Sequence, residues 1–310
     1  MPVPSALACP ANLKGVLPAV RAAEALAAGF ARAGAACVQL PLADGGDGTV
    51  STLCEEIRSV SVRDAFGRPR TAQIGRRGDA TVVEAAQVIP LDERRLDVMH
   101  ASSRGLGELI SELHPDRLLV GLGGTANMDA GAGLLEALDG LPCPTTVLCD
   151  VLTTLYEAPR LFGPQKGATP EEIEELGAHF RAMPALEPYA ALPGAGAAGG
   201  LGAAFASLGA ELVPGAATIL DLVDFDPHAA ELVVTGEGRV DATTAEGKVP
   251  AEVAQRCVAA GAVCVVFGGL VDAALPDVET VALSGDPRRT HEDLLELGQR
   301  LGARLLDAAS

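Results

Sequence analysis

The chain alternates short apolar runs with alanine-rich helical stretches, and glycine and acidic residues repeatedly follow the apolar runs. The run at 263–267 ends in Gly268-Gly269, and the run at 231–234 leads into a Thr-Gly-Glu-Gly segment. Strands that alternate with helices predict a mostly parallel sheet with helices on both faces. Ligands of such sheets bind beyond the carboxyl ends of the strands. We therefore expect the functional site where these glycine and acidic clusters gather.

The alternation assigns most of the chain to strands or helices. The predicted strands are residues 5–9, 36–40, 117–120, 146–149, 231–234, 263–267 and 280–283. The predicted helices are residues 18–32, 49–57, 129–138, 198–208, 249–260 and 291–308, and another begins at Thr169. Thr169 is expected to cap that helix, because a proline and two glutamates follow it. Residues 59–84 differ, because apolar residues separated by glycine turns predict antiparallel hairpins and so a second, smaller domain.

Composition excludes several classes of function. The chain has 310 residues and a net charge of −18, and nucleic acid is a poor partner because phosphate backbones need clustered Lys and Arg. No apolar segment is long enough to span a membrane and no signal-peptide pattern opens the chain, so a cytoplasmic location is expected. The seven cysteines show no C-x-x-C spacing, which predicts free thiols and no zinc site.

Several familiar catalytic motifs are absent. A Gly-Lys pair stands at 247–248, but Val249 follows it and the earlier glycine of a P-loop is missing. No histidine has metal-ligand spacing, and no G-x-S-x-G elbow occurs. Residues 194–199 match G-x-G-x-x-G, yet they follow proline-rich sequence instead of a strand. This loop is either an anion-binding helix start or a packing turn, and a nicotinamide-dependent oxidoreductase is a lesser alternative.

The segment 44–48 combines glycines with carboxylates at a predicted helix start. Glycines such as Gly45 and Gly46 let the backbone approach a ligand closely. The Asp44 carboxylate can hold Mg²⁺ or accept a proton. A helix start capped by aspartate explains the same residues equally well.

The segment 235–248 combines several charged residues with glycines. Glu237, Arg239 and Asp241 fall in a predicted strand-end loop, and Lys248 opens the next predicted helix. An acid can orient the attacking hydroxyl in phosphoryl transfer, and cations can stabilise the moving charge. A surface ion-pair loop is the alternative. Two further lysines in glycine-flanked loops, Lys14 and Lys166, can contact phosphate or carboxylate, although a lone loop lysine is usually solvated.

Taken together, these loops resemble the type I glycerate kinase family. The matching segments are residues 10–15 in part, 41–50, 121–133, 149–151, 162–168, 192–202 and 235–248. The resemblance implies a Rossmann-like three-layer α/β domain with a mostly parallel sheet, formed by 1–58 with 226–310, and a second α/β domain formed by 59–225. It also implies ATP- and Mg²⁺-dependent phosphorylation of D-glycerate. Glycerate is then the small-molecule partner, nucleic acid and membrane are not partners, and a homodimer is one candidate assembly.

The residues and the resemblance together define the expected site. The candidate catalytic residues are Lys14, Asp44, Asp129, Asp150, Lys166, Arg239 and Asp241, and Asp150 and Asp241 are also candidate metal ligands. The candidate substrate- and nucleotide-binding residues are Gly45, Gly46, Ser102, Gly123, Gly124, Gln165, Gly196, Gly236, Glu237 and Lys248.

The chain departs from the family pattern at three places, one of which is the run 125–129. Ala11 stands where the family usually has an aspartate. Leu152 follows Val151 where the family continues with an acidic residue, and a glycine segment is shortened within 152–161. A homologue that binds nucleotide or hydroxy acid without transferring phosphate is therefore the alternative to an active glycerate kinase.

Overall fold

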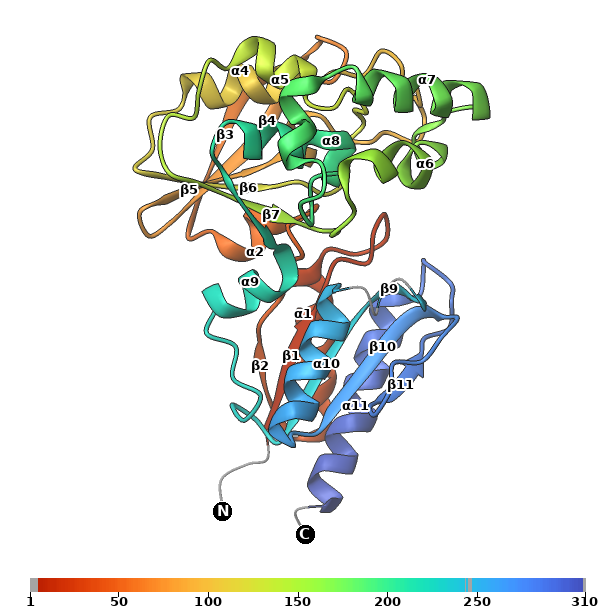
Figure 1. Cartoon of the computed structure of the whole chain (residues 1–310). Coiled ribbons are helices and arrows are strands. Elements are labelled where there is room, and N and C mark those ends of the chain that lie inside the picture. Colours follow the sequence, from red (N-terminus) through yellow and green to blue (C-terminus); the bar gives the residue numbers. More distant parts are fainter. Residues whose placement is uncertain (1–4, 243, 245–246, 309–310) are drawn as a thin grey trace. The chain divides into compact units, whose positions relative to one another are not determined.

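The computed structural model describes residues 5–242, 244 and 247–308, which belong to two compact units (Figure 1). The first unit comprises Met1–Ala43 and Ile219–Ser310, and the second comprises Asp44–Thr218. The sequence places the boundaries at 58/59 and 225/226. Residues 44–58 join the second unit in the structure, because Glu56–Arg63 is a strand of its sheet. No helix in the described part of the chain is long and apolar enough to cross a membrane.

The first unit is a five-stranded parallel sheet in the order β11-β10-β9-β1-β2. Its strands are β1 (Ser5–Pro10), β2 (Ala36–Gln39), β9 (Leu232–Val240), β10 (Cys264–Val271) and β11 (Glu279–Ala282). Its helices are α1 (Ala19–Ala33), α10 (Val249–Ala260) and α11 (Thr290–Ala308). The chain winds from β1 to β2 in one direction and from β9 to β10 in the other, so right-handed crossovers put α1 and α10 on opposite faces. Sheets of this kind bind ligands where the winding reverses, which here is between β1 and β9.

Two glycines let α1 and α11 pack with their backbones in contact. A Cβ atom at Gly29 would lie 2.2 Å from the carbonyl oxygen of Leu295, and one at Gly298 would lie 2.3 Å from that of Leu26. Leu26 and Phe30 of α1 are fully buried in the core that this helix pair forms with the sheet. Small residues on both helices therefore permit close packing in a chain with only 3% aromatic residues.

The second unit is a six-stranded mixed sheet in the order β3-β4-β5-β6-β7-β8. Its strands are β3 (Glu56–Arg63), β4 (Pro69–Arg77), β5 (Ala80–Glu84), β6 (Arg117–Gly121), β7 (Thr145–Cys149) and β8 (Glu211–Pro214). Its α-helices are α2 (Thr49–Leu53), α3 (Ala85–Val88), α4 (Arg104–Glu112), α5 (Ala132–Ala137), α6 (Ala158–Phe162), α7 (Pro170–Arg181) and α8 (Ala197–Ser207), and α9 (Gly215–Leu222) runs on into the first unit. Three short 3₁₀ helices, Leu155–Glu157, Pro164–Lys166 and Pro184–Tyr189, precede α8.

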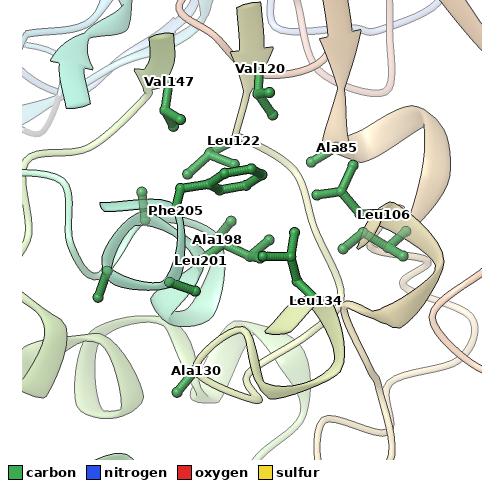
Figure 2. Packing of buried hydrophobic residues seen from close by; sticks show 14 of the residues in the cluster. Ala85, Leu106, Val120, Leu122, Ala130, Leu134, Val147, Ala198, Leu201 and Phe205 are labelled. Carbon is green, nitrogen blue, oxygen red and sulfur yellow. The ribbon is translucent and has the colours of Figure 1, made fainter. Parts of the chain in front are cut away.

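The winding of this sheet decides which of its faces carries helices. Strands β5 to β8 are parallel and advance in one direction across the sheet. Right-handed crossovers then bring the connecting helices to one face, and Figure 1 shows α4, α5 and α8 there, with α2 on the other face. The buried cluster on the helical face joins Val120 and Val147 of the strands to Leu106, Leu134 and Phe205 of the helices (Figure 2).

The predicted α/β class with mostly parallel sheets is confirmed, as are the antiparallel pairs β3-β4 and β4-β5. The capping box of Thr169 is also present. Two local predictions are wrong. The helix predicted at 49–57 ends at Leu53, because residues 56–63 pair with β4. Residues 235–240 are not a loop, because their pairing with β10 continues to Val271 and extends β9 through them.

Gly298→Ala is expected to lower the free energy of unfolding by about 1–3 kcal/mol, since the added methyl group must push α11 away from the Leu26 carbonyl. Gly177→Ala in α7 is the matched control, because its Cβ would meet only the end of the Arg181 side chain at 3.4 Å. Alanine there should be neutral or stabilising by up to about 1 kcal/mol. Urea denaturation of both variants measures the difference, and equal stabilities would contradict the packing argument.

Candidate active site

The second unit holds the segment 44–48, the Asp44 loop, against the carboxyl ends of β6 and β7. The Gly123 N–H donates to the Gly45 carbonyl oxygen over 3.2 Å. A Cβ atom at Gly121 would lie 2.3 Å from the Gly45 oxygen, and one at Gly123 would lie 2.4 Å from the Gly46 Cα. Gly45 also has φ +93°, a left-handed conformation that glycine adopts without strain. Only glycines permit this approach of two backbones.

Two carboxylates accompany this contact. A Cβ atom at Gly123 would lie 2.9 Å from Oδ2 of Asp150, which follows β7 directly. The Gly46 N–H donates to Oδ1 of Asp44 over 3.0 Å, so the aspartate fixes the turn of its own loop. The structure therefore brings together Asp150, Gly46 and Gly123, with Asp44 at the start of the same loop. Gly124 is exposed beside them and also has a positive φ, of +73°.

Lys166 is a buried cation in this unit, with 4% of its surface exposed. Its Nζ donates to the backbone oxygen of Asn127 over 2.6 Å. Burial lowers the pKa of Lys166 to about 8, against the attraction of Asp150 and Asp129, which favours the charged form. The ammonium group therefore keeps its charge at neutral pH inside the protein. Neighbouring Gln165, by contrast, is exposed.

Asp129 is a hydrogen-bond hub at the starts of α4 and α5. Its two oxygens accept from the Ser102 hydroxyl, the Ser103 N–H and hydroxyl, the Asn127 amide, and the N–H groups of Gly131 and Gly133, at 2.8 to 3.5 Å. A carboxylate with so many donors fixes the chain around it. Ser102 also lines a surface cavity of about 370 Å³ together with Phe66 and Arg95.

Asn127 and Thr125 each bury a polar atom that has no hydrogen-bond partner among the described residues. The Asn127 amide nitrogen donates to Oδ1 of Asp129 and to the Ala198 carbonyl oxygen, both at 2.9 Å, which fixes the orientation of the amide. Oδ1 of Asn127 and Oγ1 of Thr125 lack hydrogen-bond partners in the structure. Buried acceptors of this kind lose free energy unless a water or a ligand satisfies them.

The glycine loop at 194–199 is a packing turn. A Cβ atom at Gly196 would lie 2.4 Å from the Thr154 carbonyl oxygen, and one at Gly199 would lie 2.2 Å from that of Asn127. The Gly196 N–H donates to the Thr153 oxygen over 2.9 Å. Of the two readings that the sequence leaves open, close packing is the one these contacts favour, and the 3₁₀ helix Pro184–Tyr189 rather than a strand precedes the loop.

In the first unit, the loop after β1 lies beside β9 where the winding of the sheet reverses. The Ala11 N–H donates to the Gly236 carbonyl oxygen over 2.9 Å. A Cβ atom at Gly238 would lie 3.6 Å from the backbone nitrogen of Lys14, and one at Gly236 would lie 2.2 Å from the backbone carbonyl oxygen of Phe267. Lys14 itself is exposed. The sheet thus places this lysine at its own switch point.

Glu237 is the centre of a polar network at the same edge. Its carboxylate accepts from the Thr244 hydroxyl over 2.8 Å and lies 3.9 Å from Nζ of Lys248. The Asp241 N–H donates to the same threonine hydroxyl over 3.0 Å. Arg239 instead forms an exposed ion pair with Asp272 at 3.4 Å. Residues 243 and 245–246 of the predicted segment lie outside the described residues.

The structure separates the predicted residues into two groups. Asp44, Gly45, Gly46, Gly123, Asp150 and Lys166 belong to the second unit, and Lys14, Gly236, Glu237, Asp241 and Lys248 belong to the first. The two candidate metal ligands, Asp150 and Asp241, are therefore in different units.

Sequence reasoning missed several buried polar residues near these groups, among them Glu84, Ser103, Asn127 and Thr244. Glu84 alone has a local signal, because it ends an otherwise apolar strand.

The chain is similar to proteins of one family along most of its length. The family model described as the glycerate kinase family matches residues 6–141 and 141–285, and the two matches meet in the connection between α5 and β7. The glycerate kinase of Bacillus subtilis is 35% identical over 306 residues, which take in 79% of this chain and 80% of that protein. The glycerate 2-kinase of Escherichia coli is 33% identical over 305 residues, with the same shares covered.

A solved structure has the same fold. The crystal structure of glycerate kinase 2 from Salmonella typhimurium LT2 aligns with a TM-score of 0.81 and 29% sequence identity. The alignment covers 99% of both chains.

Asp129→Ala is expected to lower the free energy of unfolding by about 2–3 kcal/mol, because it leaves the buried donors at the starts of α4 and α5 without an acceptor. Asp92→Ala is the matched control, since the side chain of this exposed aspartate accepts only the Arg94 N–H in a surface turn among the bonds that the structure records. Its loss should change stability by less than about 1 kcal/mol. Chemical denaturation of the two variants measures the contrast, and a stable Asp129→Ala protein would refute the hub role.

Proposed function

Because the chain belongs to the glycerate kinase family, we propose that it transfers the γ-phosphoryl group of ATP to a hydroxyl group of D-glycerate in the presence of Mg²⁺. The chain is a phosphotransferase with an alcohol acceptor, and its substrate is a small molecule. A nucleotide is the phosphoryl donor that kinases of this kind use. The proposal names the nucleotide, the metal and the residues that act on them.

The observation that carries the proposal is the convergence of carboxylates, glycine backbone and a buried cation in the second unit. Asp150 lies beside Gly123, where two backbones approach without side chains between them. Glycine backbone of this kind lets phosphate groups come close to N–H donors. The Lys166 ammonium is buried nearby and attracts Asp150. Phosphoryl transfer needs mainly positioning and charge stabilisation, and this set of groups can supply both.

The carboxylates fit a magnesium ion that is shared with a nucleotide. Mg²⁺ prefers oxygen ligands and is usually held by one or two carboxylates together with substrate phosphates and water. Asp150 is the candidate ligand of the second unit and Asp241 that of the first, each considered within its own unit, and no group of three or more potential ligands occurs among the described residues. When bound, the ion would neutralise charge on the phosphates. Asp44 is the candidate for orienting or deprotonating the attacking hydroxyl.

The first unit contributes further cations. Lys14 stands at the switch point between β1 and β9, and Lys248 opens α10 beside Glu237. We assign these two lysines to substrate carboxylate or phosphate groups, because both lie at the carboxyl edge of a parallel sheet. Arg239 has a smaller part in this proposal, since it is paired with Asp272.

A cytoplasmic location and assembly as a homodimer also belong to the proposal. All seven cysteines are free, which suits a reducing compartment. The glycine loop at 194–199, which suggested a nicotinamide-dependent oxidoreductase, packs against Asn127 and Thr154. It therefore no longer supports that alternative.

Purified protein with ATP, Mg²⁺ and D-glycerate is expected to release ADP and one phosphoglycerate, and chromatographic separation of 2-phosphoglycerate from 3-phosphoglycerate identifies the hydroxyl that attacks. Asp150→Asn should lower kcat/KM by about 100-fold or more, because it removes charge where phosphate and metal meet. Asp92→Asn, a change of the same kind at an exposed site, is the control and should leave the rate unchanged.

Absence of turnover with D-glycerate and other hydroxy acids would reject the proposal. Activity that appears only in Ala11→Asp would show instead that this chain is a weakened homologue, because it would restore the acid that the family carries at that position.

A further inference from the structure

Glu84 is a buried acid that the proposed chemistry does not use. It ends β5 and is fully buried, next to Gly121 of β6 in the register of the sheet. Its Oε2 accepts from the Val50 N–H over 3.1 Å, and its Oε1 lies 3.4 Å from the amide nitrogen of Gln87. The backbone of Gly48 also favours the charged form of this carboxylate. Glu84 thus receives donors from both the end of the Asp44 loop and the first turn of α2.

These bonds satisfy a helix start that has no cap of its own. Helix α2 begins after Gly48, which has no side chain to accept the first N–H groups. A helix start usually relies on a Ser, Thr, Asp or Asn at that position for this purpose. Here the acceptor comes from a residue 34 positions away in the sequence. The position of the loop is therefore tied to β5 and not only to its own turn.

The same loop is fixed from its other side by the backbone contact with Gly123. The Gly123 N–H bonds to the Gly45 oxygen, and the Thr49 hydroxyl donates to the Gly46 oxygen over 2.7 Å. Glu84 holds residues 48–50 in place. Because residues 44–46 precede them in the same loop, Glu84 also helps to fix the position of residues 44–46 against β6. A displaced loop would move Asp44 and Gly46 relative to Asp150, and a shift of about 1 Å can slow a reaction about 100-fold.

We propose that Glu84 is a positioning residue that holds the Asp44 loop in register with the Gly121–Gly124 segment and with Asp150 for phosphoryl transfer. This inference rests on the proposed function. It assigns Glu84 no contact with substrate, because the carboxylate is enclosed by α2, α3 and β5.

The electrostatics of the pocket support a role beyond stability. Burial and, to a smaller extent, the nearby Asp47 carboxylate raise the pKa of Glu84, the N–H donors lower it, and the net result is a pKa of about 7. Cys54, which follows α2, is a further titratable group near Glu84. Burial raises the pKa of its thiol, Arg77 of β4 lowers it, and Glu84 raises it. Because the folded-state pKa lies above the ordinary value, the folded protein binds more protons than the unfolded chain between about pH 4.5 and 7. The contribution to stability is therefore complete at low pH and is lost as the pH rises through 7.

Because Glu84 stabilises the fold less at pH 8 than at pH 5, replacing it tests whether its role is positioning or stability. Glu84→Gln keeps the shape and one acceptor but removes the charge, so at pH 8 it should be at least as stable as the wild type. Its kcat with ATP and D-glycerate should nevertheless fall about 10- to 100-fold, because the N–H groups of residues 48 and 50 lose a charged acceptor. In the wild type kcat should rise as the pH passes through about 7, and in the variant this rise should be absent.

The matched control is Glu172→Gln. Glu172 accepts the Thr169 N–H at the start of α7 over 2.8 Å, so it is also a glutamate that caps a helix start in the second unit. It does not belong to the Asp44 loop, and its loss should leave both kcat and the pH profile unchanged. A Glu84→Gln protein with wild-type kcat and the same pH profile would overturn the inference.

Hydrogen exchange separates this inference from the proposed function. In Glu84→Ala the Val50 and Gly123 amides should exchange at least about 10-fold faster than in the wild type, since the loop loosens on both sides. Unchanged exchange at Gly123 would overturn the positioning role even if the wild type proves to be an active kinase. Faster exchange there would uphold the link between Glu84 and the loop even if D-glycerate proves to be the wrong substrate.

Discussion

The contact between the Asp44 loop and the end of β6 is the constraint on which the second-unit site depends. At Gly121 and Gly123 a single methyl group would lie within 2.4 Å of the loop backbone. A close-packed interior cannot absorb such an overlap without moving one of the two segments. Because Gly121 and Gly123 have no side chains, the Asp44 loop and Asp150 lie close together. The other polar groups of the site lie around that backbone contact.

Buried charge is the second theme of this site. Lys166, Glu84 and Asp129 each place an ionisable group in or near the interior, where an unpaired ion is costly. Each is compensated differently: Lys166 by a carbonyl oxygen and nearby acids, Glu84 by helix-start N–H groups, and Asp129 by hydroxyl, amide and N–H donors. Compensation by fixed donors and acceptors leaves little freedom of movement, which suits the phosphate-binding role that we propose for this site.

Much of the fold follows from local pattern. The period of the apolar residues predicts most strands and helices, and the capping residues at Thr169 predict a helix start that the structure confirms. Pattern fails where pairing between distant strands overrides it. Residues 54–57 have a helical pattern, but β3 begins within them. Residues 235–240 have the pattern of a loop, but they extend β9. In each case a neighbouring strand supplies the hydrogen bonds. The short strand β8 carries too few residues for its period to show.

The sequence by itself determined the α/β class, the family and the loops that carry glycine and acid, because these depend on the order and type of neighbouring residues. Only the tertiary structure decided which buried groups meet. Lys166 bonds to a residue 39 positions away, and Glu84 to one 34 positions away. It also decided that the glycines at 194–199 pack against backbone and that Arg239 pairs with Asp272. Partners of this kind are set by how strands and helices stack, and no local pattern of residues encodes that stacking.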